Sequence, residues 1–259
     1  MRRTTLAAVA LAPVCALALS ACGSSSGSGG GSGSASAANA TSAAENNAHL
    51  TSAQVNARIN AAVLKVTALH MKGTMTESGT TVSFDLQLNK DSAQGTIGEG
   101  GMQMPIVAVG GVSYFQLTPS VVKYVESSQD SSSSDALGAL LVENRWISSK
   151  SSIGASFGQS FGPMTNLSSM TKQLTSGAQD TLTYLGTSTL DGQQVAQYKD
   201  HSSDGSGPDT TMSLPLTGTA LPIQLDGGSQ GLMAFTWNQS TTVSAPPANE
   251  ILNLPGTTA

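Results

Sequence analysis

The thiol of Cys22 is the side chain whose surroundings point most directly to chemistry. Arginines at positions 2–3 open the chain, an apolar stretch follows over 6–19, and small residues at 20–21 precede the cysteine. This order is typical of a secretory signal peptide. Because the apolar run is shorter than the roughly 20 residues of a membrane-spanning helix, we expect cleavage rather than a retained transmembrane segment.

A cysteine directly after small residues also resembles the bacterial lipobox, in which the thiol receives diacylglycerol and becomes the first residue after cleavage. Leu19-Ser20-Ala21-Cys22 fits that pattern. We therefore expect residues 1–21 to be a lipoprotein signal peptide and Cys22 to be lipidated. Two acyl chains suffice for stable anchoring, which predicts an extracytoplasmic protein on the bacterial cell membrane. The alternative is an ordinary secretory signal with an incidental cysteine.

Lipidation of Cys22 has consequences for the rest of the chain. The other cysteine, Cys15, lies in the expected signal peptide, so the mature protein has no thiol for a disulfide, a nucleophile or a metal site. Loss of the two N-terminal arginines leaves 9 basic against 16 acidic residues, a formal charge of −7 instead of −5. An acidic domain argues against nucleic acid as a partner and against electrostatic docking on anionic lipid.

The residues usually found in active sites form no recognisable pattern. The three histidines, His49, His70 and His201, are scattered and lack the spacing of a metal-binding helix. The segment 154–158 misses the G-x-S-x-G nucleophile pattern. We expect no catalytic residues, no metal site and no cofactor, and we interpret His70 as a polar strand residue.

Composition divides the chain into a tether and a domain. Residues 23–44 are almost entirely Gly, Ser, Ala, Thr and Asn without apolar periodicity, which is typical of a flexible coil. We expect residues 22–49 to hold the domain clear of the membrane, and residues 50–259 to form one domain.

The sequence pattern in the first half of the domain predicts one helix followed by antiparallel strands. After a cap at Thr51, apolar residues recur at helical spacing from Val55 through Leu69. Apolar and polar residues then alternate, as in a strand with one buried face, most clearly over 82–88. Strands are expected over 71–75, 82–88, 94–99, 105–109 and 112–117, the last two joined by a tight Gly110-Gly111 turn.

Helices and then further strands follow. Helices are expected over 119–127, 135–144 and 163–174, and strands over 182–187, 193–200, 209–214, 221–225 and 232–238. Asp191-Gly192 is the type I′ hairpin dipeptide between two of these strands. Because strands and helices do not alternate, the order favours an antiparallel α+β fold.

Methionine is frequent in the domain and aromatic residues are few, at 4% of the chain. Methionine is unbranched and adaptable, so it suits surfaces that accept variable apolar shapes. A sheet face rich in Met and Val under short helices would suit an acyl chain, although ordinary core packing explains any single methionine.

Several short motifs resemble the LppX/LprG-type bacterial lipoproteins. They are the lipobox, the helix followed by Lys72-Gly73-Thr74, Phe84-Asp85-Leu86, Val112-Ser113-Tyr114-Phe115, Leu190-Asp191-Gly192, Leu221-Pro222, Phe235-Thr236-Trp237-Asn238 and Val243-Ser244-Ala245-Pro246. The resemblance spans residues 50–250. It implies a LolA-like half-barrel, a curved antiparallel sheet whose concave face is covered by helices, with lipid held between them.

These observations favour a membrane-anchored carrier or chaperone that binds a lipid or an acylated molecule. The alternative is an envelope sensor or protein-interaction module on the same fold without cargo, and a third possibility is a hydrolase whose site assembles from residues distant in sequence. The expected cavity residues are Met71, Met75, Val82, Phe84, Leu86, Leu88, Tyr114, Leu167, Met170, Phe235 and Trp237.

Overall fold

An open sheet of 11 antiparallel strands forms the framework of the protein, a computed structural model that describes residues 45–77, 79–128, 144–176, 181–201 and 209–252. The strands are β1 (Ala68–Glu77), β2 (Thr80–Asn89), β3 (Ser92–Glu99), β4 (Met102–Val109), β5 (Val112–Gln116), β6 (Trp146–Ser148), β7 (Thr181–Leu190), β8 (Gln193–His201), β9 (Thr210–Pro215), β10 (Gln224–Asp226) and β11 (Gly231–Trp237). The fold is α+β, as the sequence predicts.

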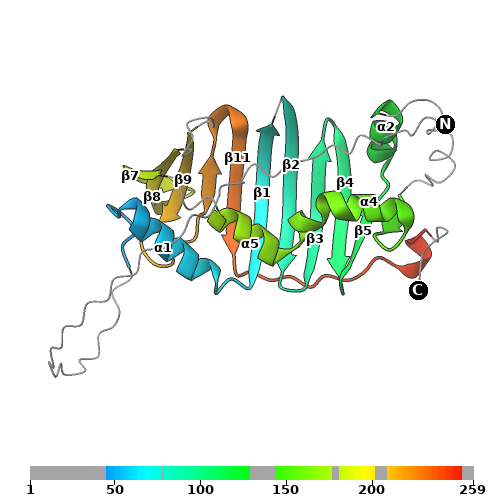
Figure 1. Ribbon diagram of the computed structural model, residues 1–259, viewed down its shortest axis with the longest axis horizontal. Helices are drawn as coiled ribbons and strands as arrows, with labels where there is room; N and C mark the ends of the chain where they lie inside the picture. Colours follow the sequence, from blue (N-terminus) through cyan, green and yellow to red (C-terminus); the bar gives the residue numbers. More distant parts are fainter. Residues whose placement is uncertain (1–44, 78, 129–143, 177–180, 202–208, 253–259) are drawn as a thin grey trace, which may run out of the picture.

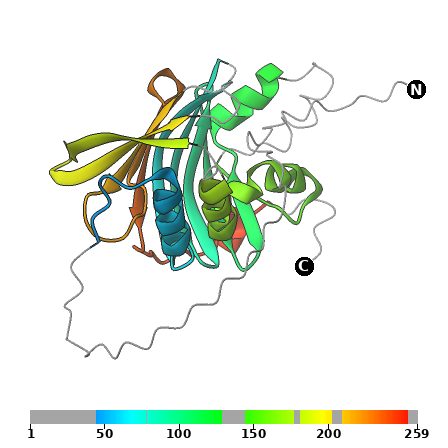
Figure 2. The ribbon, with the colours of Figure 1, turned by 60° about the vertical axis from the view of Figure 1, so that its left-hand side comes forward.

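The helices are short and lie mostly on one face of the sheet. They are α1 (Ser52–Val63), α2 (Pro119–Ser128), α4 (Ser152–Phe161) and α5 (Leu167–Ser176), with 3₁₀ turns η1 (Gly162–Thr165), η2 (Gly228–Gln230) and η3 (Ala248–Glu250). In Figures 1 and 2 the sheet curves around α1, α5 and α4, which lie along it in a row. Among the described residues, no helix has the length and apolar character needed to cross a membrane.

The two ends of the domain meet in the middle of the sheet. The strand order is β6-β5-β4-β3-β2-β1-β11-β10-β9-β8-β7, so each half forms a meander and β1 joins them by pairing with β11. At this junction Met71 lies opposite both Leu86 and Phe235. A Cβ on Gly73 would lie 1.9 Å from the Leu232 carbonyl oxygen, so only glycine allows β1 and β11 to approach this closely.

Two apolar clusters lie between the sheet and the helices. The larger one lies under α4, η1 and α5 and has Leu86 and Phe115 at its centre, both completely buried. The smaller one lies under α1, where Val55 and Ile59 pack with Tyr198 and Leu214. Trp237 and Val66 contact both clusters, so the helical face has one continuous apolar core.

The boundary of the folded domain lies earlier than expected. Asn47 belongs to the expected tether but is completely buried, and its Nδ2 donates to the Pro215 and Gly218 carbonyl oxygens at 2.9 and 3.1 Å. Its backbone amide donates to the Leu216 carbonyl oxygen at 2.8 Å. Residues 45–49 are therefore part of the domain, because backbone and side-chain hydrogen bonds hold them to the segment that follows β9.

Two helix predictions are corrected. The first helix ends at Val63 rather than continuing to Leu69, because Leu69 is completely buried in β1 between Leu88 and Trp237. The helix expected over 163–174 is divided: Asn166 is extended (φ −115°, ψ 117°), and its Oδ1 accepts from the Ser169 amide at 2.9 Å, so α5 starts there. The helix expected over 135–144 lies outside the described residues except for Asn144.

Candidate functional site

The apolar side chains predicted to line a cavity come from alternate positions of the central strands. Val82, Phe84, Leu86 and Leu88 of β2 are buried, while the residues between them are half-buried on the opposite face. Successive strand residues point to opposite faces, so these four belong to the face covered by helices. We call this helix-covered surface the inner face.

The strands beside β2 add their apolar residues to the inner face through the pairing register. Met71 pairs with Leu86 and Phe235, and Met75 pairs with Val82 near the end of β1. Met71 is almost completely buried, whereas Met75 is 39% exposed and lies at the rim. Trp237 stacks on Phe235, with ring centroids 5.9 Å apart, and its Nε1 donates to the Pro222 carbonyl oxygen at 2.6 Å.

The covering helices contribute the other side of this apolar layer. Leu167 and Met170 of α5 are buried against the sheet residues, and Met164 of η1 packs against the same cluster. From α4, Phe157 and Phe161 contact Phe115, with ring centroids 5.6 and 6.3 Å away. We call the segment α4-η1-α5 (152–176) the cover.

The structure brings nine of the eleven predicted cavity residues into one apolar cluster, leaves Met75 at the rim of the same face and excludes Tyr114. Tyr114 lies on the opposite face, because its neighbour Phe115 pairs with Ile106 and occupies the inner position. A shift of one residue along a strand reverses the face on which a side chain lies. The prediction for Tyr114 is therefore wrong, and Phe115 takes its place.

The inner face is filled by side chains in this structure. Leu86, Leu88 and Met104 have no exposed surface, and the side chains of the cover contribute to the same cluster. Two hollows of the described surface lie elsewhere. One, of about 430 Å³, lies at the strand ends around Gly79 and Gly101, and the other lies on the outer face of the sheet.

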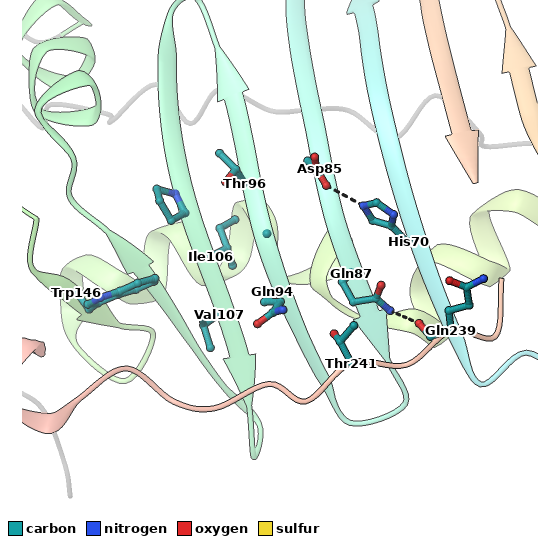
Figure 3. A pocket seen from close by; sticks show the side chains of 12 residues that line it. His70, Asp85, Gln87, Gln94, Thr96, Ile106, Val107, Trp146, Gln239 and Thr241 are labelled. Atoms are coloured by element: carbon teal, nitrogen blue, oxygen red, sulfur yellow. Dashed lines mark hydrogen bonds and ion pairs between the residues drawn. The ribbon is translucent and has the colours of Figure 1, made fainter. Parts of the chain in front are cut away.

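The outer-face hollow is a groove of about 570 Å³ that is not among the sequence-based predictions. Its floor is the outer surface of β1–β4, and Figure 3 shows His70, Asp85, Gln94 and Thr96 projecting from that floor, away from the helices behind the sheet. Gln239 and the segment after it line one side, and Trp146 of β6 lies at one end.

Charged side chains in the groove are paired with one another. His70 Nε2 donates to Asp85 Oδ1 at 2.8 Å, and Lys72 Nζ donates to Asp85 Oδ2 at 3.0 Å. The hydrogen bond from His70, helped by Lys72, holds the pKa of Asp85 below its ordinary value. His70 is a polar strand residue, as expected, and its partner Asp85 is brought to it by the pairing of β1 with β2.

A similar cluster lies on β8 and directly before β9. Asp209 accepts from Lys199 Nζ at 2.5 Å and lies 2.7 Å from His201 Nδ1, an arrangement that holds its pKa below the ordinary value. An Asp-His-Lys cluster therefore occurs twice on this sheet and is not by itself the sign of a site. Within the described ranges, no three His, Cys, Asp or Glu side chains gather as they would around a metal ion.

Comparison with known proteins gives structural likenesses at low sequence identity. No family model matches the chain, and no curated protein matches it. LprF from Mycobacterium bovis has a TM-score of 0.48 and 11% identity over 75% of this chain and 96% of its own. LppX from Mycobacterium tuberculosis, whose family the sequence resembles, has a TM-score of 0.41 and 17% sequence identity, over 74% of this chain and 99% of its own.

A third similar structure is a putative outer membrane lipoprotein-sorting protein domain from Vibrio parahaemolyticus. Its TM-score is 0.25 and its identity 11%, over 72% of this chain and 89% of its own. All three TM-scores are below 0.5. The fold of this chain is therefore established by its own strand pairing and core packing.

Proposed function

We propose that this chain is an exported lipoprotein, anchored to the cell membrane through acylated Cys22, that binds a lipid or an acylated molecule between its sheet and its cover. One observation carries the proposal. The cover contacts a broad apolar sheet face through apolar side chains, among them Phe157, Phe161, Leu167 and Met170. An acyl chain could take the place of such contacts without any exchange of hydrogen bonds.

The driving force would be the burial of the cargo's hydrocarbon. Each methylene removed from water contributes about 0.8 kcal/mol, so an acyl chain binds well to an apolar surface without polar contacts. We place it against Met71, Phe84, Leu86 and Phe235 of the sheet. Val82, Leu88, Leu167, Met170, Met75 and Trp237 would complete the lining. Methionine side chains at this interface can change rotamer to suit different chains.

Cargo entry requires the cover to move, and hydrogen bonds hold the start of the cover in place. Ser151 Oγ donates to the Ser148 carbonyl oxygen at 2.7 Å and accepts from the Gly154 amide at 3.1 Å. These bonds hold α4 to β6. The break at Asn166 separates α5 from η1, so we propose that α5 lifts while the beginning of α4 stays in place.

The alternative function is that of an envelope sensor or protein-interaction module without cargo. The filled inner face favours it, because Leu86 and Leu88 are completely buried by the protein's own side chains. A core of this kind needs no ligand to complete it. The two functions differ in whether an acyl chain reaches the inner face at all.

The two tryptophans provide the test, since Trp237 lies on the inner face and Trp146 on the outer. The full chain, purified in a nonionic detergent, is titrated with a dibrominated stearic acid, whose bromine atoms quench nearby indoles. In Trp146→Phe, which leaves Trp237 as reporter, we expect saturable quenching. In Trp237→Phe, which leaves Trp146, we expect none.

Unbrominated stearic acid controls for changes in structure, and a melting curve checks each variant. Absence of quenching of Trp237 would contradict the carrier function and leave the interaction module. Equal quenching of both indoles would also contradict it, because that pattern indicates collisions at the protein surface.

A further inference from the structure

The groove on the outer face of the sheet is built by contacts between segments distant in sequence. Gln87 Nε2 donates to the Gln239 carbonyl oxygen at 2.8 Å, and Asn89 Nδ2 donates to the Thr241 carbonyl oxygen at 2.9 Å. These bonds lay the chain after β11 across the ends of β1 and β2. Figure 3 shows this chain running along one side of the groove.

The same chain is tied again beside Trp146. The Leu252 amide donates to the Trp146 carbonyl oxygen at 2.8 Å, and Arg145 Nε donates to the Glu250 carbonyl oxygen at 3.1 Å. Ile251 forms a parallel bridge with Trp146. The wall of the groove is therefore fastened at both ends, and the partly exposed indole of Trp146 is held at one end of it.

Beside a paired charged cluster, the groove offers uncharged polar side chains to a ligand. Asp85 is engaged by His70 and Lys72, so the local charges are largely compensated. Gln94 and Thr96 project from the floor, and neither side chain has a hydrogen-bond partner among the residues that the structure describes. An amide offers two donors and an acceptor, and a hydroxyl offers both functions. This set favours a neutral ligand with many hydroxyl groups over an ion.

Trp146 adds the second feature that such a ligand needs. A flat indole presents an apolar face, on which the C–H face of a sugar ring can lie while its hydroxyls reach polar groups. The groove volume of about 570 Å³ is within the range of about 300–1,000 Å³ for small-ligand sites. Because the groove is open along the sheet, it suits an elongated ligand.

We infer that this outer groove binds a neutral oligosaccharide, with one sugar ring on Trp146 and its neighbours over Gln94 and Thr96. The site is separate from the inner face, so it does not depend on lipid binding. A chain exported as proposed would meet carbohydrate polymers outside the membrane, and the groove would hold the domain against one of them.

The test uses the full chain carrying Trp237→Phe, so that Trp146 is the sole indole. It is titrated with hexamers of glucose, of mannose and of N-acetylglucosamine while Trp146 emission is recorded. We expect at least one hexamer to change the emission saturably. In Trp146→Phe, the emission of Trp237 on the inner face should stay constant.

Two glutamine variants locate the binding. Gln94→Ala should weaken the hexamer affinity about fivefold to tenfold, as expected for loss of a hydrogen bond to the ligand. Gln197→Ala is the matched control, because Gln197 alternates with inner-face Ala196 and Tyr198 on β8, far along the sheet. It should leave the affinity unchanged.

Constant Trp146 emission with all three hexamers would overturn the inference, as would equal effects of the two glutamine variants. A response to unfolded casein but to no hexamer would also overturn it, in favour of a polypeptide ligand. None of these outcomes involves quenching by brominated lipid. Failure of the hexamer test therefore leaves the carrier function standing, and failure of the brominated-lipid test leaves the oligosaccharide site standing.

Discussion

At the scale of single residues, Tyr198 joins the segment before α1 to the sheet. The ring is completely buried, its hydroxyl donates to the Asn47 carbonyl oxygen at 2.5 Å, and it accepts from the Leu50 amide at 3.2 Å. Tyr198→Phe should lower the free energy of unfolding by about 1–3 kcal/mol, because both backbone groups lose their partner away from bulk water. Denaturant unfolding measures the change.

Tyr184 supplies the control for this prediction. Its ring packs on Tyr198 at 5.4 Å between centroids, but it is partly exposed, and we expect Tyr184→Phe to change stability by less than about 0.5 kcal/mol. Burial raises the pKa of Tyr198. Its contribution is therefore present below about pH 10 and lost as the pH rises further, so the parent and Tyr198→Phe should converge in alkali. Equal effects of the two variants at neutral pH would contradict this role.

The inner face could be predicted residue by residue where alternation was strong, and not where it was weak. Val82 to Leu88 alternate cleanly with polar residues, and all four apolar side chains are on the predicted face. In β5, Tyr114 and Phe115 are adjacent aromatic residues, so the pattern does not decide between them. Pairing with Ile106 across the β4–β5 hairpin decides it, because Ile106 is itself buried in the inner-face cluster.

At the scale of elements, α4 is the helix that the sequence did not reveal. Its residues 152–161 include two glycines and three serines, which are weak helix formers. Packing of Phe157 and Phe161 on Phe115 and the cap at Ser151 overcome this weakness. Both depend on contacts with β5 and β6 that local sequence does not specify.

Gly154 allows α4 to lie close against β6, because it has no side chain. A Cβ at this position would lie 2.0 Å from the Ser148 backbone carbonyl oxygen, which cannot move without disturbing the strand. We expect Gly154→Ala to lower the free energy of unfolding by about 1–3 kcal/mol despite the better helix propensity of alanine. Thermal and denaturant unfolding of the full chain measure the loss.

Gly162, at the other end of α4, is the matched control. It has ordinary helical backbone angles (φ −54°, ψ −44°), and a Cβ there would meet nothing within 4 Å. Gly162→Ala should leave stability unchanged or slightly raised. If Gly154→Ala behaved in the same way, α4 would not pack on β6 as described.

At the scale of the whole molecule, the sequence predicted the class of fold but not the order of the strands. Hairpin signals such as Gly110-Gly111 and Asp191-Gly192 indicate which consecutive strands pair. No such local signal joins β1 to β11, whose pairing brings residues 68–77 against 231–237. The outer groove was missed for the same reason, because its wall and floor come from opposite ends of the domain.

The mode of membrane attachment is the remaining prediction at this scale. Residues 1–44 lie outside the described part of the chain, so this prediction rests on the sequence Leu19-Ser20-Ala21-Cys22. Cys22→Ser removes the thiol that diacylglycerol would modify, and it should move the protein from the membrane fraction to the soluble or unprocessed pool. Cell fractionation followed by intact-mass measurement distinguishes these outcomes from acylation.

Cys15→Ser is the control, because Cys15 lies in the segment that cleavage would remove. This variant should stay with the membrane and carry the same lipid mass as the parent. High salt should release neither protein, since an acidic domain has little electrostatic attraction to anionic lipid and two acyl chains anchor independently of salt. If the Cys22→Ser protein remained membrane-bound in high salt with an intact N-terminus, the apolar run itself would be the anchor, and the lipoprotein assignment would be wrong.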